Sequence, residues 1–263
     1  MDFNLKGGAL LIGSLFWQDD RNEEQGKRGR KIWRDNTLKM DKVIDISVPI
    51  RYGRFSGKPE LNNQTYTMIF DNTLPVHQFG IAKAVPFKKD NFATTSDIIL
   101  EALQMSTVEG RYCDYFVKTL ISDCAWCIIS IIFNPHSVRD NIKSIILQQW
   151  KAEMLKNKSG HDLFLHEYAQ YSLKATGELD IPWPKEADGF NFLLSASTRP
   201  RFRKEVNFLD EAEIARFIHQ REYFETNKKL GIITYQDENI SEKALEFEHQ
   251  TEIDEVKSGN NSI

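Results

Sequence analysis

Cysteine is scarce in this chain of 263 residues: it has only three, and the number is odd. A framework of disulfide bonds needs paired cysteines, so we expect a reduced, cytoplasmic protein. No apolar run approaches the roughly 20 residues that span a bilayer, which argues against a membrane protein. The short apolar run at 9–17 follows Asp2 and precedes no small-residue cleavage pattern, so we expect no signal peptide.

Positive charge is not in excess either, because the formal net charge is −4. The chain therefore has no overall electrostatic footprint for nucleic acid. It contains neither a Walker-type phosphate loop nor a G-x-G-x-x-G run, which argues against the nucleotide enzymes that use them. What is present, 41% hydrophobic and 27% charged residues, is typical of a soluble globular protein with a substantial core.

Residues that bind metals do not form a strong cluster. Cys124 and Cys127 have C-x-x-C spacing, but residues three apart on a strand point to opposite faces. Cys113 and His136 raise the number of candidate zinc ligands to four without adding a second close pair. We therefore interpret the cysteines as structural thiols and expect no metal and no other cofactor.

Strand patterns dominate the first half of the chain. Apolar or alternating runs that indicate strands lie at 9–12, 43–50, 65–70, 80–86 and within 115–133. Apolar residues at helical spacing follow at 95–106, 138–155 and 162–173. Thr95 or Ser96 can cap the first of these helices. Strands followed by helices indicate an α+β protein.

The sequence changes in character after Asn134-Pro135, a stop signal. We predict one unit over 1–135 and a mainly helical extension over 136–235. The extension is expected to contain a strand at 190–195, a helix capped by Asp210 and a short strand at 232–235. High charge and a Gly-Asn-Asn-Ser ending favour a disordered tail over 236–263.

Two arginines and two aromatic residues lie together in the segment Arg51-Tyr52-Gly53-Arg54-Phe55-Ser56, which we interpret as a loop. Such a set can bind a phosphate or carboxylate and stack a base, so Arg51, Tyr52 and Arg54 are candidate ligand-binding residues. The alternative is a hairpin loop whose arginines are solvated or paired with nearby carboxylates.

The strand at 9–12 ends in Gly13-Ser14-Leu15-Phe16-Trp17. A strand followed by Gly-Ser suits an anion pocket of main-chain donors, although a plain first strand with a tight turn has the same pattern. Together with Gly80-x-Ala82 and Thr107-Val108-Glu109-Gly110, this turn resembles the gamma-glutamylcyclotransferase-like family in its order of motifs. The resemblance covers roughly 7–133, and Ile12 stands where that family usually has a tyrosine.

The resemblance implies a small mixed β-barrel with flanking helices and an enzyme without a cofactor. The backbone amides of Gly13, Ser14 and Leu15 would receive the α-carboxylate of a gamma-glutamyl compound. Glu109 would act as the general base that lets the substrate's α-amine attack its γ-carbonyl and release 5-oxoproline. The plainer interpretation of Glu109 is the last residue of a helix, followed by a capping Gly110.

A second hypothesis keeps the same fold without the reaction. In it the chain is a ligand-sensing or protein-interaction module that binds an anionic nucleotide or carboxylate through the segment Arg51–Ser56. A protein partner would then dock on the C-terminal extension.

Overall fold

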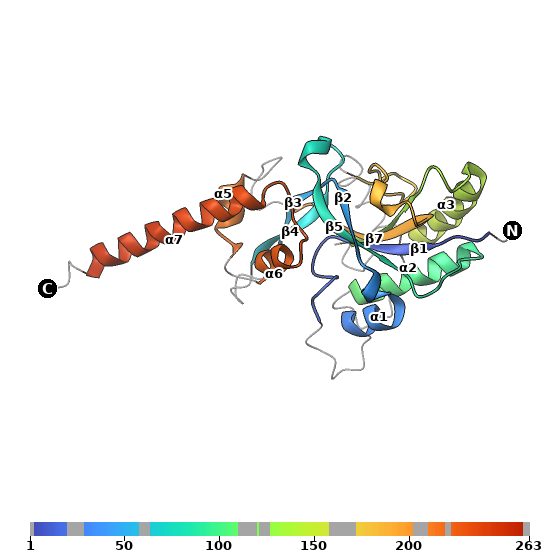
Figure 1. The fold of residues 1–263 in the computed structure, drawn as a ribbon, viewed down its shortest axis with the longest axis horizontal. Helices are drawn as coiled ribbons and strands as arrows, with labels where there is room; N and C mark the ends of the chain where they lie inside the picture. Colours follow the sequence, from blue (N-terminus) through green and yellow to red (C-terminus); the bar gives the residue numbers. More distant parts are fainter. Residues whose placement is uncertain are drawn as a thin grey trace.

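A mixed sheet of five strands forms the centre of the protein (Figure 1). The structure, a computed structural model, describes residues 3–19, 29–57, 64–109, 120, 127–157, 172–201, 210–218 and 222–259. Across the sheet the strands are β2 (Ile44–Val48), β5 (Gly80–Pro86), β1 (Gly7–Leu11), β7 (Phe192–Thr198) and β6 (Cys127–Phe133). β1 and β7 are parallel, and all other neighbours are antiparallel. The protein is therefore α+β, as the sequence predicts.

Strand β1 lies in the middle of this sheet and is buried along its whole length. Its residues alternate between two hydrophobic cores: Ala9 and Leu11 belong to one, and Leu10 to the other. Because successive side chains of a strand point to opposite faces, each core covers one face of the sheet. This explains why the predicted first strand is an unbroken apolar run rather than an alternating one.

Three helices cover the first face: α1 (Arg30–Thr37), α2 (Thr95–Glu109) and α3 (Asp140–Met154). Trp33, Ile98 and Trp150, one from each helix, are buried in the core that these helices share with the sheet. Four short 3-10 helices lie at Met40–Lys42 (η2), Val76–Gln78 (η4), Leu155–Asn157 (η5) and Lys185–Ala187 (η6).

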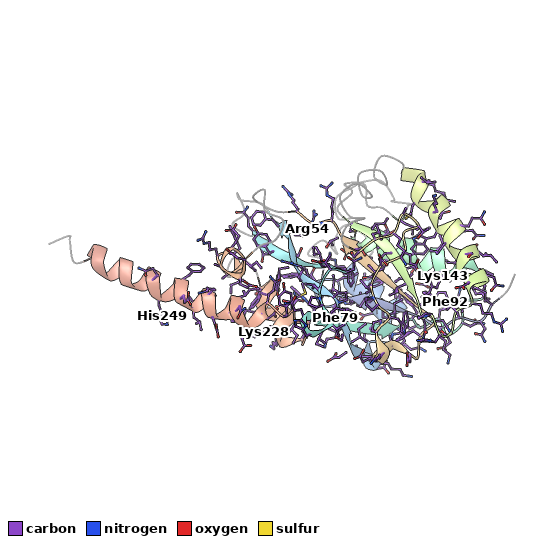
Figure 2. The ribbon with its side chains drawn as sticks, turned by 90° about the horizontal axis from the view of Figure 1, so that it is seen from above. Arg54, Phe79, Phe92, Lys143, Lys228 and His249 are labelled. Atoms are coloured by element: carbon purple, nitrogen blue, oxygen red, sulfur yellow. The ribbon has the colours of Figure 1, made fainter. Side chains whose placement is uncertain are left out.

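The second face packs against a two-stranded hairpin and three further helices. These elements are β3 (Ile50–Ser56), β4 (Thr65–Phe70), α5 (Glu211–Ala215), α6 (Tyr223–Lys229) and α7 (Asp237–Gly259). α7 packs against α5 through its first turns and then extends past the rest of the molecule (Figure 1). Viewed from above, the exposed His249 lies on this projecting part (Figure 2). Among the residues described, no helix has the length and apolarity needed to cross a membrane.

The chain after residue 135 is not a separate extension. β7 is inserted between β1 and β6 and pairs with both, so strands from before and after residue 135 form one sheet. The predicted boundary at 135 therefore divides a single folding unit. Within the described residues, the strand pairing does not close this sheet into a barrel.

Three predicted segments differ from the structure. The segment 51–56 is strand β3 rather than a loop, and 237–259 is helix α7 rather than a disordered tail. Around 232–235 the structure has only an isolated bridge between Ile233 and Ile81. The helix predicted at 162–173 and the first part of the 115–133 region lie outside the described residues, apart from a few positions.

Candidate functional site

The turn after β1 is a single helical turn. The Phe16 amide donates to the Gly13 carbonyl at 2.9 Å, and the Gln18 amide donates to the Ser14 carbonyl at 2.7 Å. Within the part of the chain that the structure describes, the amides of Ser14 and Leu15 donate to no other residue. These are two of the three residues whose amides the resemblance assigns to a carboxylate.

Gly13 is required by close packing rather than by its backbone conformation. A Cβ atom at this position would lie 2.2 Å from the hydroxyl oxygen of Tyr223 in α6. That hydroxyl accepts a hydrogen bond from the Met68 amide at 3.3 Å. The backbone of Gly13 is not in the left-handed region, so its conformation alone does not require a glycine. Trp17 adds a second link to α6, because its indole N–H donates to the Asn227 side chain at 2.8 Å.

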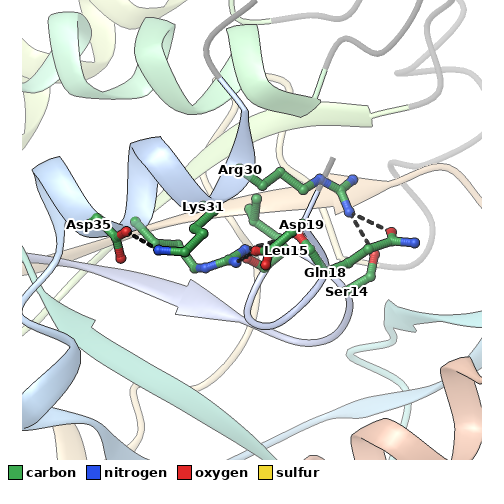
Figure 3. Close-up of polar contacts among 8 residues, drawn as sticks. Ser14, Leu15, Gln18, Asp19, Arg30, Lys31 and Asp35 are labelled. Carbon is green, nitrogen blue, oxygen red and sulfur yellow. Dashed lines mark hydrogen bonds and ion pairs between the residues drawn. The ribbon is translucent and has the colours of Figure 1, made fainter. Parts of the chain in front are cut away.

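Arg30, the first residue of α1, contacts this turn (Figure 3) and also pairs with Glu109. Its Nη1 atom donates to Ser14 Oγ and to Gln18 Oε1, both at 3.0 Å. Its Nη2 atom lies 2.9 Å from Glu109 Oε1. Arg30 and Glu109 are each 3% exposed, so this ion pair is buried. Arg30 was not among the site residues predicted from the sequence.

Arg34 lies one helical turn after Arg30 and holds the other end of the same turn. Its Nη1 atom donates to the carbonyl oxygens of Leu15 at 3.0 Å and Gln18 at 3.1 Å, and its Nη2 atom pairs with Asp19. Burial lowers the pKa of the Arg34 guanidinium, and the nearby Asp19 carboxylate opposes that shift. Because Arg34 occupies carbonyls of the turn, the turn keeps its shape with the early amides on the opposite side.

Glu109 is the last residue of α2, so the position of this helix sets the position of the carboxylate. At the opposite end of α2, Thr94 Oγ1 accepts from the Asp97 amide at 3.2 Å, and the Asp97 carboxylate accepts from the Thr94 amide at 2.9 Å. This reciprocal cap begins one residue before the predicted Thr95 or Ser96. Gly110, the predicted capping glycine, lies outside the described residues.

The other predicted site residues do not lie in a ligand-binding loop. Arg51 is 6% exposed, and its Nη1 atom lies 3.5 Å from Asp71 Oδ2. Arg54 donates from Nη1 to the Arg199 carbonyl at 2.6 Å. Tyr52 is buried, and burial raises the pKa of its phenol well above the ordinary value, which keeps it neutral. Strand β3 therefore engages these side chains inside the fold.

One of the three cysteines lies among the described residues. Cys127 is buried in β6, whereas Cys113 and Cys124 lie outside the described residues. His136 is exposed after the end of β6. Among the residues that the structure describes, no three His, Cys, Asp or Glu side chains gather closely enough to hold a metal ion.

Two of the predicted site residues contact one arginine that was not predicted. Ser14 and Glu109 were both predicted, and the structure brings them to the same guanidinium. Arg30, Gln18 and Tyr223 were not predicted. The only available signal was the four-residue spacing of Arg30 and Arg34, which places two arginines on one side of a helix.

No protein-family model, curated protein or solved structure matches the chain.

Proposed function

We propose that this protein is a gamma-glutamylcyclotransferase-like enzyme, which releases 5-oxoproline from a gamma-glutamyl compound. The observation that carries the proposal is the convergence of Ser14 and Glu109, far apart in sequence, on the two Nη atoms of Arg30 at 3.0 and 2.9 Å. The resemblance assigned these two residues to the carboxylate cradle and to the general base. Nothing in the local sequence pattern requires them to be neighbours.

The path of the chain around the sheet supports the barrel that the resemblance implies. β2 continues through Pro49 directly into β3, so one bent strand takes part in both sheets. After β7 the chain bonds to β3: the Phe55 amide donates to the Arg201 carbonyl at 2.7 Å, and the Arg201 amide donates to the Gly53 carbonyl at 3.1 Å. The two sheets are thus linked at the start of β3 and again near its end, and this linkage supports the proposed barrel without closing the sheet.

The proposed reaction needs one base and one anion cradle. The α-amine of the substrate attacks its own γ-carbonyl carbon; the new C–N bond closes the five-membered ring, and the C–N bond to the leaving amine breaks. The two protons that the α-ammonium loses end on the leaving amine, and Glu109 carries them. Because attack is intramolecular, the turn contributes mainly by holding the substrate in the reactive conformation.

The test is the substitution Glu109→Gln, assayed as release of 5-oxoproline from glutathione and from simple gamma-glutamyl amides. Glutamine keeps the size and one acceptor oxygen but cannot accept the amine proton. We expect turnover per folded molecule to fall by on the order of a hundredfold or more. Circular dichroism and thermal melting give the folded fraction, because the substitution also leaves the buried Arg30 without its carboxylate.

The matched control is Glu101→Gln, which removes a partly buried carboxylate two turns earlier on the same helix. It should leave turnover unchanged. Activity that survives in Glu109→Gln would remove this residue from the mechanism. An unmodified protein that releases no 5-oxoproline from any of these compounds would contradict the proposed reaction.

A second candidate is a non-catalytic module of the same fold that binds a carboxylate or another anion. One observation favours it: Arg30 holds a buried positive charge next to the amides of Ser14 and Leu15. The segment 51–56, which the sequence suggested for this role, gives no support because it is strand β3. Saturable binding of a gamma-glutamyl amide without release of 5-oxoproline would favour this candidate over the enzyme.

A further inference from the structure

We propose that residues 236–247, the start of α7 and the residue before it, are a releasable latch that holds the turn after β1 in place through Tyr52, Met68 and Tyr223. α7 begins beside the hairpin and α6, and its distal part extends past the rest of the molecule (Figure 1). The latch acts on the position of the turn, so it works in the same way for a gamma-glutamyl compound or for another anion.

The hairpin of β3 and β4 connects the latch to α6. Gln236 Oε1 accepts from the Tyr52 amide in β3 at 3.0 Å, and both residues are buried. Tyr52 lies directly opposite Met68 in the pairing of β3 with β4. The Met68 amide donates to the Tyr223 hydroxyl of α6 at 3.3 Å, and the rings of Tyr52 and Phe224 are 6.0 Å apart. The start of α7 and α6 therefore bind the same pair of opposed residues in the hairpin.

α6 in turn holds the turn after β1 through two residues that lie four apart, Tyr223 and Asn227. The Tyr223 hydroxyl occupies the space of a Cβ at Gly13, which would lie 2.2 Å from its oxygen. The Trp17 indole N–H donates to Asn227 at 2.8 Å, and the rings of Trp17 and Tyr223 are 6.3 Å apart. A shift of α6 therefore acts on both ends of the turn.

Two buried polar atoms oppose the docking of α7. Asp237 Oδ1 accepts from the Thr234 amide at 2.9 Å and from its hydroxyl at 2.6 Å, whereas Asp237 Oδ2 is buried without a hydrogen bond. The Tyr52 hydroxyl is likewise buried and has no hydrogen-bond partner among the described residues. Burial raises the pKa of this phenol, and the nearby Asp237 carboxylate raises it further. Release of α7 would return both atoms to water, so docking sacrifices their hydration.

Apolar burial favours the docked state. Ile240 and Ala244 are 0% and 4% exposed, and Phe247 packs against the same core. All three residues lie in the first half of a helix of 23 residues. Because α7 can leave this core without the unpairing of any strand, its release is a local opening rather than global unfolding.

The experiment measures amide hydrogen exchange of the full-length protein by mass spectrometry, in peptides that cover 13–18, 236–247 and α3. The amides of Phe16, Trp17 and Gln18 donate to carbonyl oxygens of the turn, so their exchange reports whether the turn keeps its shape. α3 packs on the other face of the sheet, and its exchange reports global unfolding.

Ile240→Ala removes apolar contact from the latch. We expect exchange to become about tenfold faster both in 236–247 and in 13–18, with α3 unchanged. Tyr52→Phe removes the unpaired hydroxyl but keeps the ring and the amide, so exchange should become about threefold slower in both peptides. Leu245→Ala is the matched control, at an α7 residue that is 56% exposed, and it should change none of the three peptides.

Tyr223→Phe tests the route, because it removes the hydroxyl between Met68 and Gly13 and keeps the ring. In this background Ile240→Ala should still accelerate exchange in 236–247. Its added effect on 13–18 should fall from about tenfold to less than about threefold. An undiminished effect on 13–18 would show that the turn is not held through this hydroxyl and would overturn the proposed route.

Faster exchange in 236–247 of Ile240→Ala without any change in 13–18 would overturn the latch, because α7 would then open without affecting the turn. If α3 also exchanges faster, Ile240→Ala unfolds the whole protein and Tyr52→Phe decides instead. Slower exchange confined to 236–247 and 13–18 in Tyr52→Phe supports the latch, and unchanged exchange in 13–18 contradicts it. None of these measurements needs turnover, so failure of the proposed reaction is distinguished from failure of the latch.

Discussion

The described residues include two buried pairs of an arginine and a carboxylate, and the two pairs differ in their other contacts. Arg30–Glu109 and Arg51–Asp71 are similarly buried, with exposed fractions of 3%, 3%, 6% and 0%. The sequence drew attention to one member of each pair, Glu109 as a base and Arg51 as an anion receptor. Burial and charge alone therefore do not separate the two pairs.

The other contacts of the two ion pairs do distinguish them. Asp71 Oδ1 accepts from the Thr73 amide at 3.0 Å and from the Thr73 hydroxyl at 2.6 Å, and the Asp71 amide donates to the Pro49 carbonyl at 2.9 Å. The bond to Pro49 and the ion pair with Arg51 join the start of β3 to the end of β4, and the Thr73 contacts lie within the turn that follows β4. This pair therefore completes a hairpin. Arg30 instead joins a turn, the start of one helix and the end of another, through Ser14 of the turn and Glu109.

The difference indicates how a structural ion pair can be told from a functional one. A pair whose remaining bonds are local satisfies the geometry of its own hairpin, and a ligand cannot enter without breaking the hairpin. A pair that bridges separate segments beside main-chain donors can exchange partners while the segments stay in place. We therefore predict a role in stability for Arg51–Asp71 and, under the proposed function, a role in ligand binding for Arg30–Glu109.

The largest expected effect is on stability, in Arg51→Met. Removing Arg51 leaves the fully buried Asp71 carboxylate without its cation, so we expect the free energy of unfolding to fall by about 3 kcal/mol. Turnover per folded molecule should be unchanged, since Arg51 lies in β3. Urea denaturation measures the first quantity and the 5-oxoproline assay the second.

The control for Arg51→Met is Arg216→Met, which should change stability by less than about 0.5 kcal/mol, as exposed substitutions usually do. A loss of ligand binding in folded Arg51→Met, with little change in stability, would reverse the assignment of the two pairs. It would also restore the interpretation of segment 51–56 as a binding element.

An intermediate effect is expected from Gly13→Ala, which tests how tightly the turn beside Arg30 is packed. The added methyl group would lie 2.2 Å from the Tyr223 hydroxyl, so the hydroxyl must move and lose its bond from the Met68 amide. We expect a loss of about 2 kcal/mol in the free energy of unfolding, which is typical of overpacking. Ligand affinity should fall as well, because the amides of the turn shift.

Tyr223→Phe sharpens this prediction through a double-mutant cycle. The phenylalanine lacks the hydroxyl, so the methyl group of Gly13→Ala should cost less in this background, with a coupling of about 1 kcal/mol. Additive losses would show that the tyrosine ring, whose Cζ atom lies 3.1 Å from the added Cβ, rather than its hydroxyl resists the methyl group.

The strands were the part of the fold that the sequence predicted best. β1, β4 and β5 are short apolar runs bounded by polar residues, so their signal is local. The place of β7 between β1 and β6 was not predictable, because parallel pairing across more than 180 residues leaves no mark in either strand. The boundary at 135 failed for the same reason.

Two segments that contain charged residues were predicted to lack regular structure, and the structure shows a strand in one and a helix in the other. Arg51 and Arg54 were placed in a loop punctuated by glycine, yet both lie in β3, whose pairing with β4 has a bulge between Tyr52 and Arg54. The tail was predicted to be disordered from its charge. Its Ile240 and Ala244, four residues apart, are buried by the packing of α7, and that spacing was the signal overlooked.

The candidate site was also predicted only where its signal is local in the sequence. The turn residues and Glu109 were found from short motifs, whereas Arg30 lies at the end of a polar stretch that looks like a loop. Its importance comes from the position of α1 relative to α2, which only tertiary packing determines. A buried arginine is recognised by its partners, and those partners lie 16 and 79 residues away along the chain.

The smallest expected effect is a dependence of stability on pH, and it concerns the cap of the helix that ends at Glu109. Asp97 caps the start of α2, and its hydrogen bond to Lys89, followed by those to Thr94, lowers its pKa from 3.8 to about 2. Between pH 4 and pH 2 the folded state therefore binds fewer protons than the unfolded state. The stability contributed by the cap is fully present above about pH 4 and is lost as the pH falls through 2.

In urea denaturation, Asp97→Asn should be less stable than the unmodified protein by about 1 kcal/mol at pH 6, and the difference should shrink toward zero near pH 2. Glu101 on the same helix supplies the opposite sign, because burial raises its pKa. Glu101→Gln should be the more stable protein at pH 6, and its advantage should disappear as the pH falls and Glu101 becomes protonated in both states. A difference for Asp97→Asn that does not vary between pH 6 and pH 2 would show that the charge of Asp97 does not hold the helix that carries Glu109.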